Sequence, residues 1–126
     1  MVEQRRCIET PEAPRPIGPY CQGNVAGPFV FTAAMGGVRA DGRLVEGGIG
    51  PETEQALLNI VAVLRAGGCD SGDVAKVTVY LARLSDFDAM NAVYRGHFRP
   101  PYPARSIVQT ALPAGVVAFD AVALRP

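Results

Sequence analysis

The chain has 126 residues, of which 48% are hydrophobic and 19% charged, and its 12 Lys and Arg balance its 12 Asp and Glu. This length supports one hydrophobic core, so we expect a single domain over residues 1–126. The balanced charge provides no basic surface for nucleic acid or an anionic membrane, and no apolar run approaches the ~20 residues that a membrane span requires.

The cysteine and histidine content indicates a cytoplasmic protein without a metal site. The first six residues carry charge and lack the apolar core of a signal peptide, so we expect the chain to stay in the cytoplasm. Cys7, Cys21 and Cys69 are odd in number and widely spaced, which indicates free thiols rather than a disulfide framework or a zinc site. His97 is the only histidine, which excludes a multi-histidine metal site, and we expect it on the surface near a helix end.

The first third of the chain predicts a stiff loop and then a buried strand. Residues 12–19 hold three prolines and a glycine, which excludes regular structure and delivers Tyr20 to a fixed place. Residues 29–35 are rich in β-branched and aromatic side chains, so we expect a strand that is buried on both faces. Asp41 and Gly42 then predict a hairpin turn into residues 43–45.

A helix and a strand follow in the middle of the chain. The helix begins near Pro51, which suits a first turn, and ends at the two glycines of residues 67–68, about four turns later. Its apolar positions recur at helical spacing and are Leu57, Leu58, Val61 and Leu64. Residues 73–81 alternate between apolar and polar side chains, which predicts a strand with two unlike faces.

A second helix is predicted from Ser85, which forms a weakened capping box with Asp88. The residues that trace one face of this helix are Phe87, Met90, Asn91, Tyr94 and Phe98. Asn91 is the polar residue on that face. Its side chain is either a core amide satisfied by nearby backbone or a group that binds a ligand.

Two strands complete the predicted fold. Proline-rich residues 99–103 end the second helix, and strands follow at residues 105–109 and 116–124. Asp120 interrupts the otherwise apolar last strand. Helices separated by pairs of strands predict an α+β domain.

Arg105 stands at the entry to a strand that is predicted to be buried at residues 107–108, so its charge needs a partner. The planar guanidinium suits a carboxylate that is held by two parallel hydrogen bonds, which indicates a pocket for a small organic acid. The alternative is that Arg105 reaches solvent or pairs with Asp or Glu of its own chain.

With these elements in place, the chain resembles the Rid family, also called YjgF and formerly described as the L-PSP endoribonuclease family. The similarity runs from about Pro14 to the C-terminus. It is carried by residues 17–22, 58–64, 74–79 and 103–106, together with Asp86, Phe87, Asn91 and Tyr94. Each motif alone is weak, and their order and spacing together identify the family.

The resemblance implies a chorismate-mutase-like fold, in which a mixed β-sheet has two helices packed on one face. It also implies a homotrimer with clefts between the subunits. The residues themselves support the need for a partner. Two helices cover only one side of a sheet, and strands as apolar as these would leave the opposite face in water.

The best-known family members hydrolyse reactive enamines and imines, such as 2-aminoacrylate, to a 2-oxo acid and ammonia, without a metal or other cofactor. By this resemblance Arg105 clamps the substrate carboxylate, and the backbone at Ile107 adds a hydrogen bond. Tyr20 lines the cleft and is expected to take part in catalysis with Arg105, and the other residues expected in the substrate site are Asn91, Phe87 and Ala33. An imine is already electrophilic, so the protein must supply orientation and a group that places water.

The chain departs from the family pattern where that water would be placed. Ala118 stands where deaminating members carry the glutamate thought to position it. The nearest acid, Asp120, lies on the same face of the strand but roughly 7 Å away, and is the candidate catalytic carboxylate. Ala33 replaces a hydroxyl of the cleft, and Ile107 stands where some members have cysteine.

Two functions are therefore compatible with the sequence. The first is a divergent deaminase for small carboxylate-bearing imines. The second is a non-hydrolytic trimer that binds a 2-oxo acid or unstable intermediate, acts as a chaperone, or promotes a cyclisation from which water is excluded. RNA cleavage is the weakest alternative, because the charge is balanced and the chain has a single histidine.

Overall fold

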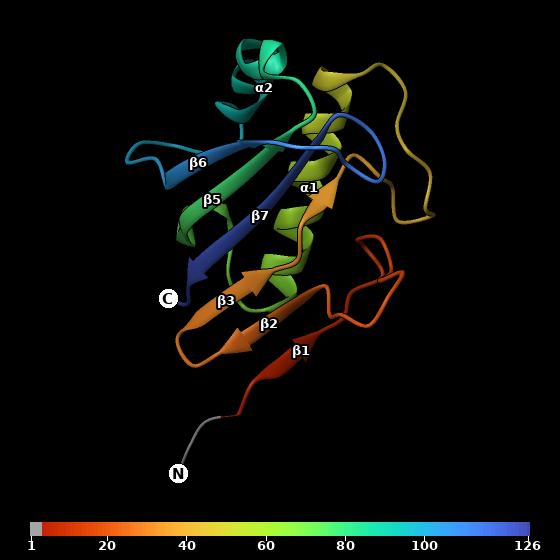
Figure 1. Ribbon diagram of the computed structural model, residues 1–126. Coiled ribbons are helices and arrows are strands. Elements are labelled where there is room, and N and C mark those ends of the chain that lie inside the picture. Colours follow the sequence, from red (N-terminus) through yellow and green to blue (C-terminus); the bar gives the residue numbers. More distant parts are fainter. Residues whose placement is uncertain (1–3) are drawn as a thin grey trace.

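The computed structural model describes residues 4–126, which form one sheet with two helices on one side of it (Figure 1). The strands are β1 (Arg6–Ile8), β2 (Gly23–Ala26), β3 (Phe29–Thr32), β4 (Met35–Gly36), β5 (Val74–Leu81), β6 (Ala104–Gln109) and β7 (Val117–Leu124). The helices are α1 (Ile49–Ala66) and α2 (Phe87–Tyr94), with short 3-10 turns η1 (Ser71–Asp73) and η2 (Leu84–Asp86). Residues 1–3 belong to the charged segment that lacks the apolar core of a signal peptide, and they lie outside the described residues.

The sheet is mixed, as predicted. Its strand order is β1-β2-β3-β7-β5-β6, and β4 also pairs with β7. The pair β5–β6 is parallel, and the chain crosses between these two strands through α2. The other pairs of named strands are antiparallel. The α+β class with two helices on one face is thereby confirmed.

Helix α1 follows the predicted spacing and supplies the core. Pro51 lies in its first turn, and the chain leaves it at residues 67–68, where Gly68 has a φ of +89° that favours glycine. The buried apolar side chains of the helix are Ala56, Leu57, Ile60, Val63 and Leu64. Leu58 was predicted on this face but is 50% exposed, because the buried stripe passes through Leu57 instead.

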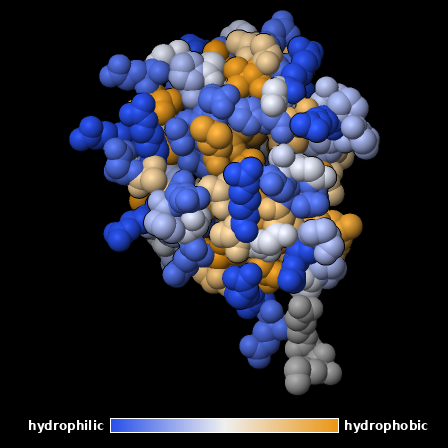
Figure 2. Space-filling view, turned by 180° about the vertical axis from the view of Figure 1, so that it is seen from behind, coloured by the Kyte–Doolittle hydropathy of each residue, from blue (hydrophilic) through white to orange (hydrophobic). Residues whose placement is uncertain are grey.

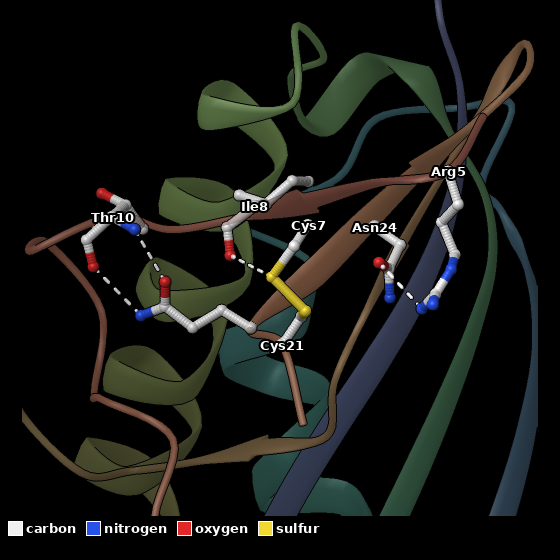
Figure 3. The surroundings of a disulfide bond; sticks show 7 residues. Arg5, Cys7, Ile8, Thr10, Cys21 and Asn24 are labelled. Carbon is white, nitrogen blue, oxygen red and sulfur yellow. Dashed lines mark hydrogen bonds between the residues drawn. A yellow bond between two sulfur atoms is a disulfide. The ribbon is translucent and has the colours of Figure 1, made fainter. Parts of the chain in front are cut away.

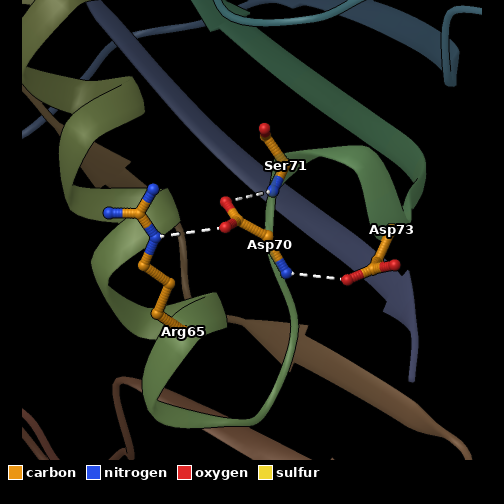
Figure 4. Close-up of polar contacts among 4 residues, drawn as sticks. All are labelled: Arg65, Asp70, Ser71 and Asp73. Carbon is orange, nitrogen blue, oxygen red and sulfur yellow. Dashed lines mark hydrogen bonds and ion pairs between the residues drawn. The ribbon is translucent and has the colours of Figure 1, made fainter. Parts of the chain in front are cut away.

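A capped turn connects α1 to β5 (Figure 4). The Asp70 carboxylate accepts a hydrogen bond from the Ser71 amide, and the Asp70 amide donates to the Asp73 carboxylate, both at 2.8 Å. The bond from Ser71 lowers the pKa of Asp70. Arg65 approaches the same carboxylate at 3.4 Å. This turn fixes where β5 begins, and β5 then alternates between buried and half-buried residues as predicted.

The strand predicted over residues 29–35 is broken and covered on one face only. The chain leaves β3 after Thr32 and pairs again as β4 at Met35. Val30 is fully buried, whereas Phe29 and Phe31 are 41% and 42% exposed. The burial predicted for residues 107–108 of β6 was also wrong at Val108, which is 42% exposed. In both strands the exposed side chains point to the face of the sheet that no helix of this chain covers.

The second helix is shorter than predicted and begins differently. Asp86 is its N-cap residue and makes no capping hydrogen bond through its side chain, so the capping box of Ser85 and Asp88 is not formed. Phe98 is buried but lies beyond the end of α2. His97 is half-buried, with its Nε2 atom 2.9 Å from the Glu54 carboxylate, rather than on the surface.

The prediction of three free thiols was wrong. Cys7 and Cys21 form a disulfide, with their Cα atoms 5.7 Å apart, and Cys69 is buried and free. The reason is the pairing of β1 with β2, which places Cys7 opposite Asn24 and close to Cys21. Sequence spacing alone does not reveal this pairing.

The two faces of the sheet differ in what covers them. On the helix-covered side, the odd-numbered residues of β7 from Val117 to Ala123 are buried in the core. The view from behind shows the side of the molecule that carries the helices, where hydrophilic residues cover most of the surface and hydrophobic patches lie between them (Figures 1 and 2). The strand side chains exposed on the other face include Phe29, Phe31, Val108 and Leu124, each 41–51% exposed. This second face is the apolar surface for which the sequence predicts a partner.

Candidate functional site

An apolar pocket lies at one end of the uncovered face of the sheet. Its volume is about 340 Å³. The residues that line it are Pro14, Arg15, Ile17, Tyr20, Ala34, Met35, Gly36, Val38, Tyr80, Leu112, Pro113, Ala114 and Ala118. Arg15 is the charged residue among these lining residues, and none of them is a carboxylate. Tyr20 and Ala118, two positions that the sequence singled out, therefore meet in one cavity.

The wall that carries Tyr20 is anchored by Gln22, a residue that sequence reasoning did not assign. Gln22 is 3% exposed, and its amide nitrogen donates to the carbonyls of Thr10, Ala13 and Pro14 at 2.9–3.3 Å. Its amide oxygen accepts from the Thr10 amide at 2.7 Å. A buried amide with this many partners fixes the start of the proline-rich loop. Tyr20 itself is 49% exposed, and its hydroxyl accepts a hydrogen bond from the Ile17 amide.

The opposite wall of the pocket is anchored by a buried carboxylate. Glu52 of α1 is 4% exposed and accepts a hydrogen bond from the Val116 amide at 2.7 Å. Gly115, with a φ of +71°, and Gly37 leave room for this side chain, because a Cβ atom at either position would collide with it. Glu52 thus positions the loop that brings residues 112–114 to the pocket.

Arg105 lies elsewhere, in a second pocket beneath α2. Its side chain is half-buried, and its Nη1 atom donates to Asn91 Oδ1 at 2.6 Å. The guanidinium carbon lies 4.8 Å from the ring centre of Tyr94 and 5.6 Å from that of Phe87. Within residues 4–126, Arg105 makes no ion pair with Asp or Glu. Neutral groups therefore hold the guanidinium, and its positive charge is available to bind an anion.

Asn91 and Tyr94 hold the guanidinium of Arg105 in place. The Asn91 carbonyl oxygen accepts from the guanidinium, so this amide orients Arg105 rather than satisfying core backbone. Tyr94 is 5% exposed, and its ring also stacks on Phe119 at 6.2 Å. Burial raises the pKa of Tyr94, so its hydroxyl stays protonated near neutral pH. The other residues lining this pocket are Arg95, Tyr102 and Pro103.

Two further predicted binding residues lie outside the lining of both pockets. Ile107 is half-buried two residues after Arg105, on the same face of β6, and packs against the core. Ala33 is half-buried, and its amide donates to the Gln22 carbonyl at 2.8 Å. The neighbour of Ala33, Ala34, lines the apolar pocket in its place.

Asp120 is engaged by a tyrosine. The Tyr80 hydroxyl donates to Asp120 Oδ2 at 2.7 Å, and this hydrogen bond raises the pKa of Tyr80. Tyr80 pairs with Ala118 across the β5–β7 ladder and lines the apolar pocket, whereas Asp120 is absent from that lining. The carboxylate is therefore connected to the pocket through its hydrogen bond with Tyr80.

One chain does not bring the predicted site residues together. Arg105 pairs with Val77, whose side chain faces the helices, whereas Ala118 pairs with Tyr80, whose side chain faces the open side of the sheet. Val77 and Tyr80 are three residues apart on β5, which is roughly 10 Å along the strand. In Figure 1 the start of β6 and the loop before β2 lie at opposite sides of the molecule. The two pockets are therefore separate within this chain.

The described residues also bear on membranes and metals. No helix within residues 4–126 has both the length and the apolar character needed to cross a bilayer. The same part of the chain contains no group of three or more His, Cys, Asp or Glu arranged to hold a metal ion.

The fold is that of a small α+β protein with a mixed sheet and two helices on one face. Residues 10–120 match the family model described as Endoribonuclease L-PSP, and the chain belongs to this family, also named Rid or YjgF. Among its curated relatives is the goat (Capra hircus) 2-iminobutanoate/2-iminopropanoate deaminase, which is 43% identical over 124 residues and covers 96% of this chain and 90% of its own length. The human protein of the same name is 40% identical over the same shares of both chains.

Solved structures agree with this assignment. RidA from an Antarctic Psychrobacter has a TM-score of 0.90 and 36% identity, covering 94% of this chain and 98% of its own. E. coli TdcF with bound serine has a TM-score of 0.88 and 36% identity, covering 96% and 99% of the two chains. The similarity thus spans nearly the whole chain in both sequence and structure.

Proposed function

We propose that this protein is a divergent imine and enamine deaminase, which converts small carboxylate-bearing 2-imines of the 2-aminoacrylate type to 2-oxo acids and ammonia. The single observation that carries the proposal is Arg105, whose guanidinium is held by Asn91 and two aromatic rings with no carboxylate partner in residues 4–126. The names of the relatives support it, and TdcF holds serine, which also carries a carboxylate. Its test is the release of ammonia from 2-iminobutanoate generated in the assay.

Arg105 supplies the orientation that this reaction needs. The guanidinium N–H groups that remain beside the bond to Asn91 clamp the substrate carboxylate in the fork geometry typical of such pairs. The imine carbon is already electrophilic, so a water oxygen adds to it, both water protons pass to the nitrogen, the carbon–nitrogen bond breaks, and ammonia leaves the 2-oxo acid. The step is a hydrolysis without a change of oxidation state. The work of the protein is positioning the substrate and placing the water.

The complete site is proposed to lie between subunits of a homotrimer. The family resemblance favours this assembly, and so does the apolar, uncovered face of the sheet. Because Arg105 and the Tyr20–Ala118 pocket are separate in one chain, one subunit would contribute the anion clamp and its neighbour the apolar pocket. Such a cleft exists only in the assembled protein.

The trimer gives a direct prediction. Equilibrium sedimentation of the full chain at micromolar concentration should give about three chains per particle, the number in a closed ring with three-fold symmetry. A stable monomer under these conditions would refute the cleft between subunits and, with it, the proposed role of Arg105.

A second candidate function rests on the composition of the apolar pocket. No carboxylate lines it in the described chain, and Ala118 occupies the place where a water-positioning group would be expected. A pocket of this kind holds ligands by apolar contact and excludes water. We therefore keep a non-hydrolytic trimer that binds or stabilises a 2-oxo acid or an unstable intermediate, or promotes its cyclisation, as the alternative. Ligand binding without ammonia release would favour it.

A further inference from the structure

Figure 3 shows the disulfide between Cys7 and Cys21, and Cys21 directly follows Tyr20 in the chain. The disulfide joins the middle of β1 to the residue that follows Tyr20 in the chain. Cys7 is exposed and Cys21 half-buried. Both line an open groove of the surface together with Thr10, Arg15 and Tyr20. A small thiol in solution can therefore reach this disulfide.

Residues 15–20 have few other ties to the rest of the described chain. All six are exposed, with Ile17 at 92% and Tyr20 at 49%. Their hydrogen bonds among residues 4–126 stay within the segment, from the Ile17 amide to the Tyr20 hydroxyl and from the Tyr20 amide to the Gly18 carbonyl. Gln22, buried two residues after Tyr20, anchors the chain on both sides of the segment, through the Pro14 carbonyl and through the Ala33 amide. The covalent link at Cys21 is thus the anchor nearest to Tyr20.

We propose that Cys7 and Cys21 form a reversible redox site, and that their disulfide holds residues 15–20, with Tyr20, against the apolar pocket. The effect on imine hydrolysis rests on the proposed function, whereas the effect on the segment does not. Opening the disulfide removes the covalent link between β1, a strand of three residues at the edge of the sheet, and the residue that follows Tyr20, while β1 stays paired with β2. A segment with exposed backbone and few contacts then samples more conformations.

The chemistry is an exchange with a low-molecular-weight thiol. A thiolate attacks the exposed Cys7 sulfur, the bond to Cys21 breaks, and Cys21 leaves as a thiolate that takes up a proton. A second thiol attacks the mixed disulfide on Cys7 and releases the oxidised small molecule, which leaves two protein thiols. A small-molecule disulfide drives the reverse reaction. Cys69 does not compete, because it is buried and its burial raises the pKa of its thiol.

The full chain should be compared after treatment with oxidised glutathione and after treatment with dithiothreitol. Alkylation and peptide mass analysis should show Cys7 and Cys21 reduced in the native fold, with Cys69 unmodified until the protein is unfolded. Hydrogen exchange at the amides of residues 17, 18 and 20 should be about tenfold faster in the reduced protein, with exchange in α1 unchanged. The double variant Cys7→Ser/Cys21→Ser should show the exchange rates of the reduced protein under both conditions. The variant Cys69→Ala should keep the difference in exchange between the two treatments.

Equal exchange of residues 17, 18 and 20 in both states, or a disulfide that resists dithiothreitol in the native fold, would overturn the redox site. In a protein that hydrolyses 2-iminobutanoate, reduction should lower kcat/KM several-fold, because Tyr20 belongs to the proposed site. An equal kcat/KM in both states would refute the link between the disulfide and the pocket. If neither state releases ammonia, the proposed function fails, and the exchange measurement still decides the redox site.

Discussion

Replacing Arg105 with alanine is expected to abolish the binding of 2-oxobutyrate while the trimer stays folded. Arg105 is held by Asn91 and by the rings of Phe87 and Tyr94, so its removal breaks no ion pair of the described chain. The loss of a desolvated, charge-assisted pair costs about 2–5 kcal/mol, which corresponds to a roughly 30- to 5,000-fold weaker affinity. Titration calorimetry with pyruvate or 2-oxobutyrate measures this directly.

The matched control for this experiment is Arg105→Lys. Lysine keeps the charge but lacks the planar fork, so its affinity should fall between those of the wild type and the alanine variant. Urea unfolding of all three proteins separates binding from stability. Unchanged affinity in Arg105→Ala together with a large loss of stability would show that Arg105 is a structural residue and that the anion pocket lies elsewhere.

Introducing a carboxylate at Ala118 is expected to raise the rate of imine hydrolysis. The wild-type protein should release ammonia from 2-aminoacrylate or 2-iminobutanoate only slowly, because clamping supplies orientation without a base that places water. Ala118 lines the apolar pocket directly, so a glutamate there reaches the proposed substrate. The expected gain is up to the ~10²–10⁴-fold that a positioned acid–base group typically gives. Burial in this apolar lining will raise the pKa of the new carboxyl and limit the gain at low pH.

Asp120→Asn in the wild-type background is the control for that prediction. Asp120 accepts the Tyr80 hydroxyl, and an Asn side chain keeps an acceptor there without the charge. We expect this variant to leave the slow wild-type rate within a few-fold, because Asp120 does not line the pocket. Fast wild-type hydrolysis that is lost in Asp120→Asn would show that Asp120 has taken over the catalytic role and that the Ala118 account is wrong.

Periodicity predicted most of the fold. The helical spacing around Leu57 and the alternation in residues 73–81 correspond to α1 and β5, because both patterns reflect burial against a single core. The predictions failed where burial depends on what lies beyond the element. Phe31 and Val108 are as apolar as core residues, yet they face the side of the sheet that this chain leaves uncovered. The local sequence of a strand does not determine which face of the sheet the helices cover.

The candidate site was predicted residue by residue but not as an arrangement. The resemblance pointed to Arg105, Asn91 and Tyr20, and the structure places Asn91 on the guanidinium. Only the strand register shows that Arg105 and Tyr20 belong to separate pockets. The Cys7–Cys21 disulfide and the anchoring role of Gln22 were missed, because both depend on the pairing of β1 and β2 and on the fold of the loop between them.

The central claim is that the site is built from two subunits, and a subunit-mixing experiment tests it most directly. Arg105→Ala and Tyr20→Ala chains, each inactive alone, are unfolded together in equal amounts, refolded, and assayed for ammonia release from 2-iminobutanoate. In randomly mixed trimers about a quarter of the clefts pair an intact Tyr20 with an intact Arg105 from the neighbouring chain, so about a quarter of the wild-type activity should return. A mixture no more active than its two parents would show that both residues serve a site within one chain, and would contradict this account.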